Sequence, residues 1–139
     1  MDCPCGSELE YKNCCGAIIK KERIAETAEE LMRSRYTAFT AANVDYLLNS
    51  NHQSTRPNKQ RKAIKKWAQS IEWIGLTIIN KIDGEIDNNE GYVEFRAVYI
   101  ENDKYEQIHE NSYFVKENNK WFYVGGTDIE TLNKEKFFL

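Results

Sequence analysis

The sequence has no long hydrophobic run, no basic leader and no large excess of charge of one sign. No apolar stretch approaches the roughly 18 residues that a membrane-spanning helix requires. The first residues, Met-Asp-Cys-Pro-Cys-Gly-Ser, have neither the basic start nor the apolar stretch of a signal peptide. The formal net charge of −3 gives no support for general nucleic-acid binding. We therefore expect a soluble, cytoplasmic protein that has no membrane span and no nucleic-acid partner.

Cysteine is missing from most of the chain, because all four cysteines lie within the first 15 of its 139 residues. Cys3 and Cys5 are separated by one proline, and Cys14 and Cys15 follow after eight further residues. Thiols stay reduced in the cytosol, where clustered cysteines are more often metal ligands than disulfides. The alternatives are two disulfides or four buried thiols that bind nothing. Burial of four thiols is not expected, because the segment around them is polar and has little other apolar mass. The pattern predicts a zinc site.

Zinc prefers four thiolates at the corners of a tetrahedron, at S–Zn distances of about 2.3 Å. Two closely spaced cysteine pairs can point four sulfurs at one ion if the backbone turns tightly between them. Gly6 and Ser7 supply such a turn after the first pair. Four protein thiolates leave no open position for water, so we expect one zinc ion per chain with a structural role.

The flanking residues carry a resemblance. Cys-Pro-Cys-Gly-Ser at 3–7, followed by Tyr-Lys-Asn-Cys-Cys-Gly at 11–16, resembles the SEC-C zinc motif at the carboxy-terminus of the SecA translocase. In SecA that motif binds the chaperone SecB and lies near lipid and ribosome contacts. The resemblance implies that the loop between the cysteine pairs docks onto a protein partner. We expect Tyr11 and Lys12 to carry most of the contact, because aromatic and cationic side chains are common interface anchors. Alternatively, the loop only closes the metal site and Tyr11 packs on it.

Helical spacing of apolar residues dominates the first half of the chain. Thr27, followed three residues later by Glu30, is a capping-box pattern, and the apolar residues after it predict a helix over 27–42 that Asn43 ends. Further helices are predicted over 44–49 and 59–69, with a polar loop over 52–58 and a polar bridge over 17–25. The third helix has a basic face, interpreted as a solvated surface or as a contact for an acidic or phosphate-bearing partner: Lys59, Arg61, Lys62, Lys65 and Lys66.

From residue 71 onward the apolar period changes to two. This period and the intervening turn residues predict strands near 71–82, 91–101, 105–116 and 120–126. Four consecutive strands joined by short turns form an antiparallel meander. Helices followed by one curved sheet indicate an α+β domain. Residues 129–139 are expected to form a short helix or an extended tail.

Several segments together resemble the uncharacterised bacterial YchJ family. They are Leu-Met-Arg-Ser-Arg-Tyr at 31–36, Asp-Tyr-Leu-Leu at 45–48, His52 with Ser54, Glu-Trp-Ile-Gly-Leu at 72–76 and Trp-Phe-Tyr-Val-Gly-Gly at 121–126. The resemblance implies a cone-shaped fold like nuclear transport factor 2, in which three helices pack on a curved antiparallel sheet and leave a cavity. We therefore expect a zinc knuckle over 1–17, a nuclear-transport-factor-2-like domain over 26–128 and a tail over 129–139.

The candidate functional residues support two kinds of function. Arg35 falls on the apolar stripe of the first helix, so we expect it to reach inward and pair with Glu110, as a structural ion pair or as part of a site. His52 lies beside Ser54, but no Gly-x-Ser-x-Gly elbow supports a catalytic serine. Aromatic side chains can line the cavity, although most aromatics are simply core. The candidate pocket residues are Arg35, His52, Trp67, Trp73, Glu110 and Trp121.

An adaptor is the function that the sequence favours. In that interpretation the knuckle docks onto a protein, and the cone binds a ligand or forms a homodimer. The alternative is a small-molecule-binding protein or an enzyme that uses the cavity of the cone. No convincing pair of base and nucleophile is present, so we identify no catalytic residue, and structural zinc is the only cofactor expected.

Overall fold

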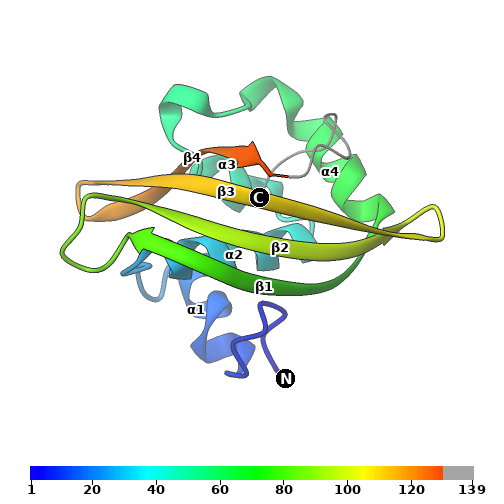
Figure 1. Ribbon diagram of the computed structural model, residues 1–139, viewed down its shortest axis with the longest axis horizontal. Coiled ribbons are helices and arrows are strands. Elements are labelled where there is room, and N and C mark those ends of the chain that lie inside the picture. Colours follow the sequence, from blue (N-terminus) through cyan, green and yellow to red (C-terminus); the bar gives the residue numbers. More distant parts are fainter. Residues whose placement is uncertain (130–139) are drawn as a thin grey trace.

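Helices cover one face of a single four-stranded antiparallel sheet in the computed structural model, which describes residues 1–129 (Figure 1). The sheet is a meander in which each strand pairs with the next along the chain. This confirms the predicted α+β fold. The predicted tail lies outside the described residues, except for Ile129. The elements are α1 (Cys15–Ile19), α2 (Ala28–Thr40), α3 (Val44–Asn49), α4 (Arg61–Ser70), β1 (Glu72–Asp83), β2 (Glu90–Glu101), β3 (Lys104–Glu117) and β4 (Lys120–Asp128).

The start of α2 has one of the two hydrogen bonds of the predicted capping box, and the Glu30 side chain bonds to the residue before the cap instead of to the cap itself. Thr27 Oγ1 accepts a hydrogen bond from the Glu30 backbone N–H at 3.1 Å, while the Glu30 carboxylate accepts from the Glu26 N–H at 2.8 Å. The helix ends two residues earlier than predicted, because Ala42 adopts a left-handed conformation with φ +52°. Asn43 does not end α2. It caps α3 instead, accepting from the Tyr46 N–H at 3.1 Å.

Nearly the whole circumference of α2 is buried. Nine of its 13 residues are buried, including the predicted apolar stripe from Ala28 to Phe39. Ser34, Tyr36, Thr37 and Ala38 lie off that stripe and are buried as well, because α1 and α3 pack on α2 in addition to the sheet. The helix therefore lies in the centre of the molecule.

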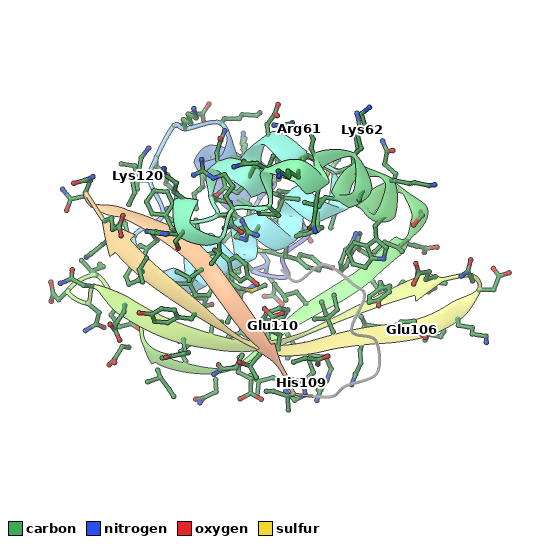
Figure 2. The ribbon with its side chains drawn as sticks, turned by 90° about the horizontal axis from the view of Figure 1, so that it is seen from above. Arg61, Lys62, Glu106, His109, Glu110 and Lys120 are labelled. Atoms are coloured by element: carbon green, nitrogen blue, oxygen red, sulfur yellow. The ribbon has the colours of Figure 1, made fainter. Side chains whose placement is uncertain are left out.

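The sheet curves around this helix. The β2 residues Val93, Phe95, Ala97 and Tyr99 are buried, and the residues between them are more exposed. Register shifts interrupt the β1–β2 ladder twice and the β3–β4 ladder once, and such bulges bend strands. Figure 2 shows the resulting separation of faces: Glu110 lies on the helix side of β3, and its neighbour His109 lies on the opposite side.

The segment between the cysteines and α2 is not the polar bridge that the sequence predicts. Ala17, Ile18 and Ala25 are buried, and α1 extends into the segment as far as Ile19. The same core cluster contains these cysteines together with residues of α2 and of the sheet. No helix among residues 1–129 is long and apolar enough to cross a membrane.

Two adjacent glycines in β4 test how tightly the sheet packs around Glu110. A Cβ atom on Gly126 would collide with the Glu110 carboxyl group, whereas a Cβ atom on Gly125 would meet nothing within 4 Å. We expect Gly126→Ala to lower the free energy of unfolding by about 1–3 kcal/mol, the usual cost of overpacking. The matched control, Gly125→Ala, should change it by less than about 0.5 kcal/mol. Urea denaturation measures both, and equal effects of the two substitutions would contradict this packing.

Candidate metal centre and buried polar core

The four cysteine side chains converge on one point. Their Sγ atoms all lie within 4.8 Å of one another, with 3.7 Å between Cys5 and Cys14 and 4.0 Å between Cys14 and Cys15. A tetrahedral zinc ion with Zn–S bonds of about 2.3 Å requires S–S edges of about 3.8 Å. The cluster has the donor type, number and spacing of a closed four-thiolate site, so it could hold a metal ion.

Groups around the sulfurs fix the geometry of the cluster. The Ser7 hydroxyl lies 3.2 Å from Cys14 Sγ and also accepts from the Leu9 N–H. Thr37 of α2 brings its hydroxyl within 3.8 Å of Cys3 Sγ. Arg33 donates from Nη1 to the Cys5 carbonyl at 2.8 Å and from Nε to Glu29. Sequence reasoning placed Ser7 in the turn but gave no signal for Thr37, because its role depends on how α2 packs.

The burial of the cluster favours a structural centre. All four cysteines are buried, with Cys5 fully inaccessible. Hydrogen bonds from neighbouring groups, chiefly Cys15 and then Ser7, lower the pKa of the Cys5 thiol to about 4, despite the opposing effect of burial. The pKa of Cys15 is raised by its hydrogen bond with Cys5 and by burial, and burial raises the pKa of Cys14. A thiolate is the form that binds metal. The arrangement can hold an ion rigidly but offers it no exchangeable ligand position.

Tyr11 and Lys12 differ in their surroundings. The Tyr11 ring is half-buried against Gly16, where an added Cβ atom would lie 2.7 Å from the ring, and Lys20 lies 5.8 Å from its centroid. Lys12 is 75% exposed and pairs with Glu10 at 3.6 Å. Tyr11 thus packs on the cysteine segment, as the alternative interpretation holds, and of these two residues only Lys12 projects into solvent. Leu9, which sequence reasoning did not single out, is 55% exposed in the same loop.

Arg35 reaches into the domain as predicted. It is 3% exposed, donates from Nη1 to the Leu47 carbonyl at 2.8 Å and to Ser50 Oγ at 2.7 Å, and lies 4.4 Å from the centroid of the Tyr123 ring. Glu110 is fully buried and accepts a hydrogen bond from the Ser112 hydroxyl. The two charges interact through space. The hydrogen bonds described for Arg35 go to α3 and not to Glu110. Arg35 instead ties α2 to α3.

The structure does not bring the six candidate pocket residues together. Trp67 and Trp73 form an aromatic cluster with Phe39 and Tyr99, with neighbouring ring centroids 5.4–6.1 Å apart. Arg35 and Glu110 belong to the buried polar core described above. His52 lies between the Ser54 hydroxyl at 2.7 Å and Glu117 at 2.8 Å, where its Nδ1 caps the turn that follows it.

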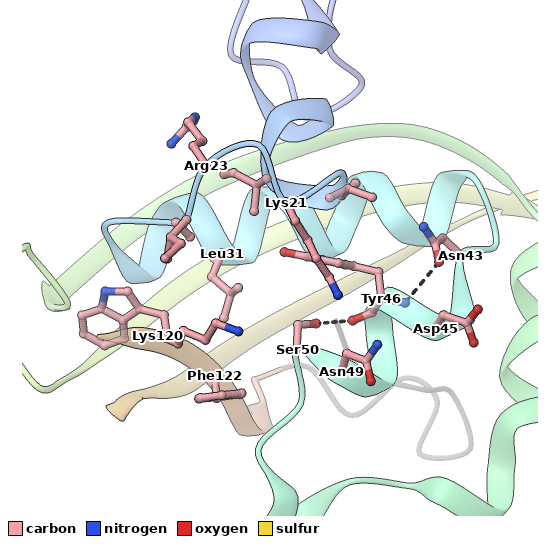
Figure 3. A pocket seen from close by; sticks show the side chains of 15 residues that line it. Lys21, Arg23, Leu31, Asn43, Asp45, Tyr46, Asn49, Ser50, Lys120 and Phe122 are labelled. Atoms are coloured by element: carbon pink, nitrogen blue, oxygen red, sulfur yellow. Dashed lines mark hydrogen bonds between the residues drawn. The ribbon is translucent and has the colours of Figure 1, made fainter. Parts of the chain in front are cut away.

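Trp121 lies elsewhere again, in a groove of about 600 Å³ (Figure 3). It is the only one of the six candidates that lines this groove. Its indole N–H donates to the Glu26 carbonyl at 3.1 Å, which fixes β4 to the segment before α2. The groove forms where α1 and residues 21–25 meet α3 and β4. It is therefore not the cavity that was predicted inside the cone.

The raised pKa of Glu110 predicts how the stability of the protein depends on pH. Burial raises this pKa to about 7, although the hydrogen bond from Ser112 and the charge of Arg35 lower it. An unfolded glutamate titrates near 4.5, so between about pH 4.5 and 7 the folded state holds a proton that the unfolded state has lost. The stability that Glu110 contributes is therefore greatest at acidic pH and falls as pH rises through this window, by on the order of 3 kcal/mol in total.

Glu110→Gln should remove that component, because glutamine does not ionise. We expect the free energy of unfolding of the wild type, relative to the variant, to decrease from pH 5 to pH 7 and to level off above. Urea denaturation at a series of pH values measures the difference. Parallel profiles for the two proteins would show that Glu110 titrates normally.

Sequence comparison finds two family matches along the chain. Residues 27–126 match the middle, NTF2-like domain of YchJ, and residues 2–17 match the SEC-C motif. The UPF0225 protein plu2503 of Photorhabdus laumondii is 39% identical over 126 residues, covering 89% of this chain and 79% of that protein. The UPF0225 protein YchJ of Shigella dysenteriae is 41% identical over 125 residues, covering 90% and 82%.

Solved structures share the fold. The solution structure of RPA3114, a SEC-C motif containing protein from Rhodopseudomonas palustris, superposes with a TM-score of 0.84 at 27% identity, covering 94% of this chain and 100% of that one. A crystal structure of a SEC-C motif containing protein from Psychrobacter arcticus gives 0.78 at 26% identity, covering 98% and 87%. With a SEC-C motif ahead of an NTF2-like domain, and relatives about 40% identical over most of its length, this chain belongs to the YchJ (UPF0225) family.

Proposed function

We propose that this protein is an adaptor in which a structural zinc ion, held by Cys3, Cys5, Cys14 and Cys15, presents the loop over residues 7–13 to a protein partner. The observation that carries the proposal is the combination of a closed, buried cysteine cluster with an exposed apolar residue, Leu9, in the loop that the cluster holds. A closed four-thiolate site cannot activate water, so its contribution to function is shape.

The loop is held rigid along its length. The Cys3 N–H donates to the Leu9 carbonyl at 2.8 Å, and the Tyr11 N–H donates to the Met1 carbonyl at 3.0 Å. A β-bridge joins Asp2 to Glu10. Because these contacts order the loop before any partner arrives, docking would lose little conformational entropy.

The charges around Leu9 indicate the chemistry of the partner. Among residues 2–13, Asp2, Glu8 and Glu10 are exposed acids and Lys12 is the one exposed basic side chain, which already pairs with Glu10. An apolar recess that accepts Leu9, surrounded by basic side chains, would complement this surface. In SEC-C motifs of the SecA type the comparable region meets a partner protein, which agrees with this placement.

The metal can be tested by its stoichiometry and by its effect on stability. We expect one zinc per chain by elemental analysis, and loss of the ion in Cys14→Ser. Because the cysteines share one core with α2 and the sheet, zinc removal should lower the Tm of the whole chain in a single transition. A single transition would also show that the predicted knuckle over 1–17 and the predicted domain over 26–128 unfold together. A Tm unchanged by chelation, or protein purified without metal, would contradict the proposal.

Docking can be tested with variants that keep the metal. We expect Leu9→Ser to weaken partner capture about tenfold or more, because burying a leucine side chain contributes about 1.5–3 kcal/mol and the serine variant loses that contribution. Tyr11 is left intact, since its ring packs on Gly16. The matched control is Tyr105→Ser, which removes a 75% exposed apolar side chain at the start of β3.

The measurement is quantitative affinity purification followed by mass spectrometry, with zinc content determined for every variant. We expect a set of proteins that the wild type and the Tyr105→Ser control enrich equally and that the loop variant fails to enrich. If the loop variant retains zinc and enriches the same proteins to the same extent, the loop is not the docking surface.

A further inference from the structure

We propose that the groove between the SEC-C segment and the NTF2-like domain binds a small organic anion with an apolar body. Its volume of about 600 Å³ lies within the range of small-molecule sites, which is roughly 300–1,000 Å³. This inference is independent of the adaptor proposal, because the groove and the loop over residues 7–13 share no residue.

The floor of the groove is apolar and is built from both parts of the chain. Ile18 and Ile19 come from α1, Leu31 comes from α2, and Trp121 and Phe122 come from β4. Ile24 lies in the segment between α1 and α2 and is 54% exposed. Ile18, Leu31 and Trp121 are themselves nearly buried, so Ile24 is the most exposed apolar side chain of the groove. A concave apolar floor surrounded by polar groups is typical of a ligand site.

The rim carries positive charge that is not neutralised. Lys21 and Lys120 are exposed, and neither forms an ion pair with another residue in the described part of the chain. Figure 3 shows the two side chains entering the groove from different elements, Lys21 from the segment after α1 and Lys120 from the start of β4. Together they can receive an anionic head group while the apolar body lies on the floor.

The other charged residues of the groove have partners. Arg23 pairs with Glu30 at 2.9 Å, and Asp45 pairs with Arg61 of α4. The groove is therefore locally basic in a chain whose formal net charge is −3. This difference favours an anionic ligand over a neutral or cationic one.

Lys21 occupies its position at a conformational cost. Its φ is +64°, in the left-handed region where glycine is the usual residue after a helix. The Lys21 N–H bonds to the Ile18 carbonyl at 3.1 Å, and the Glu22 N–H bonds to the Ala17 carbonyl at 2.8 Å, which closes α1. A glycine would close the helix as well, so the lysine side chain is not required by the backbone.

The test uses octanoate as the anionic probe, with 1-octanol as its neutral counterpart and acetate as the head group alone. Binding is followed by NMR on ¹⁵N-labelled zinc-loaded protein, using the Trp121 indole N–H and the backbone amides of residues 18–25 as local reporters. We expect octanoate to shift these signals in a saturable way, and to bind at least fivefold more tightly than 1-octanol. Acetate should bind too weakly to saturate.

The variant Lys21→Ala with Lys120→Ala should weaken octanoate binding about fivefold to tenfold while leaving 1-octanol binding unchanged, as expected for the loss of two partly solvated charge contacts. The matched control is Lys59→Ala with Lys62→Ala, which removes the same charge from exposed positions outside the groove. A third variant, Lys21→Gly, should keep the Tm and still lose affinity for octanoate.

Two results would overturn the proposal. One is that octanoate shifts no groove signal in folded wild-type protein. The other is that the groove variant and the control variant bind octanoate equally well, which would show that only the net charge of the chain matters. If octanoate binds as expected, the same titration with octyl phosphate shows whether the groove prefers a phosphate or a carboxylate head group, because the preferred anion binds more tightly.

Discussion

The packing of the cysteine cluster against α2 is the contact on which the rest of the structure depends. Arg33 of α2 donates to the Cys5 carbonyl, and Thr37 of the same helix approaches Cys3 Sγ. From another face of α2, Arg35 donates to α3 and lies against Tyr123 of β4. A helix buried on nearly all sides needs an apolar or paired contact for each face. The cysteine segment provides the contacts that the sheet alone cannot.

This arrangement separates rigid parts from surfaces available for binding. The ionisable groups inside, Arg35 and Glu110, are enclosed, and each forms at least one hydrogen bond, as buried ionisable side chains usually do. Glu110 Oε1 has no hydrogen-bond partner in the described part of the chain, and burial of the carboxyl group raises the pKa of Glu110 to about 7. The four cysteine sulfurs face one another and are buried. The loop around Leu9 and the groove beside Trp121 are open to solvent, and both lie next to the segment that contains the cysteines. The two proposed binding surfaces therefore both lie beside the cysteine segment.

Much of the fold could be predicted from the sequence, because its signals are local. The capping box at Thr27 and the change of apolar period at residue 71 predict the helices and the four strands, and the spacing of the cysteines predicts their convergence. The pairing of Arg35 could not be predicted, since its partners Leu47 and Ser50 meet it only through tertiary packing. The groove was missed for the same reason. It requires Lys21 and Lys120, about a hundred residues apart, to lie at one junction, and no local pattern encodes that contact.

The central claim is that the cysteine segment and the NTF2-like domain form one cooperative unit through α2. Native-state hydrogen exchange, measured residue by residue with and without zinc, tests it most directly. If the claim is correct, zinc removal will reduce the protection of amides in the middle of α2, such as Met32 and Tyr36, together with those of α1, and to a similar extent. Loss of protection confined to residues 1–19, with α2 and the sheet unchanged, would show that the two parts are energetically independent and would contradict the claim.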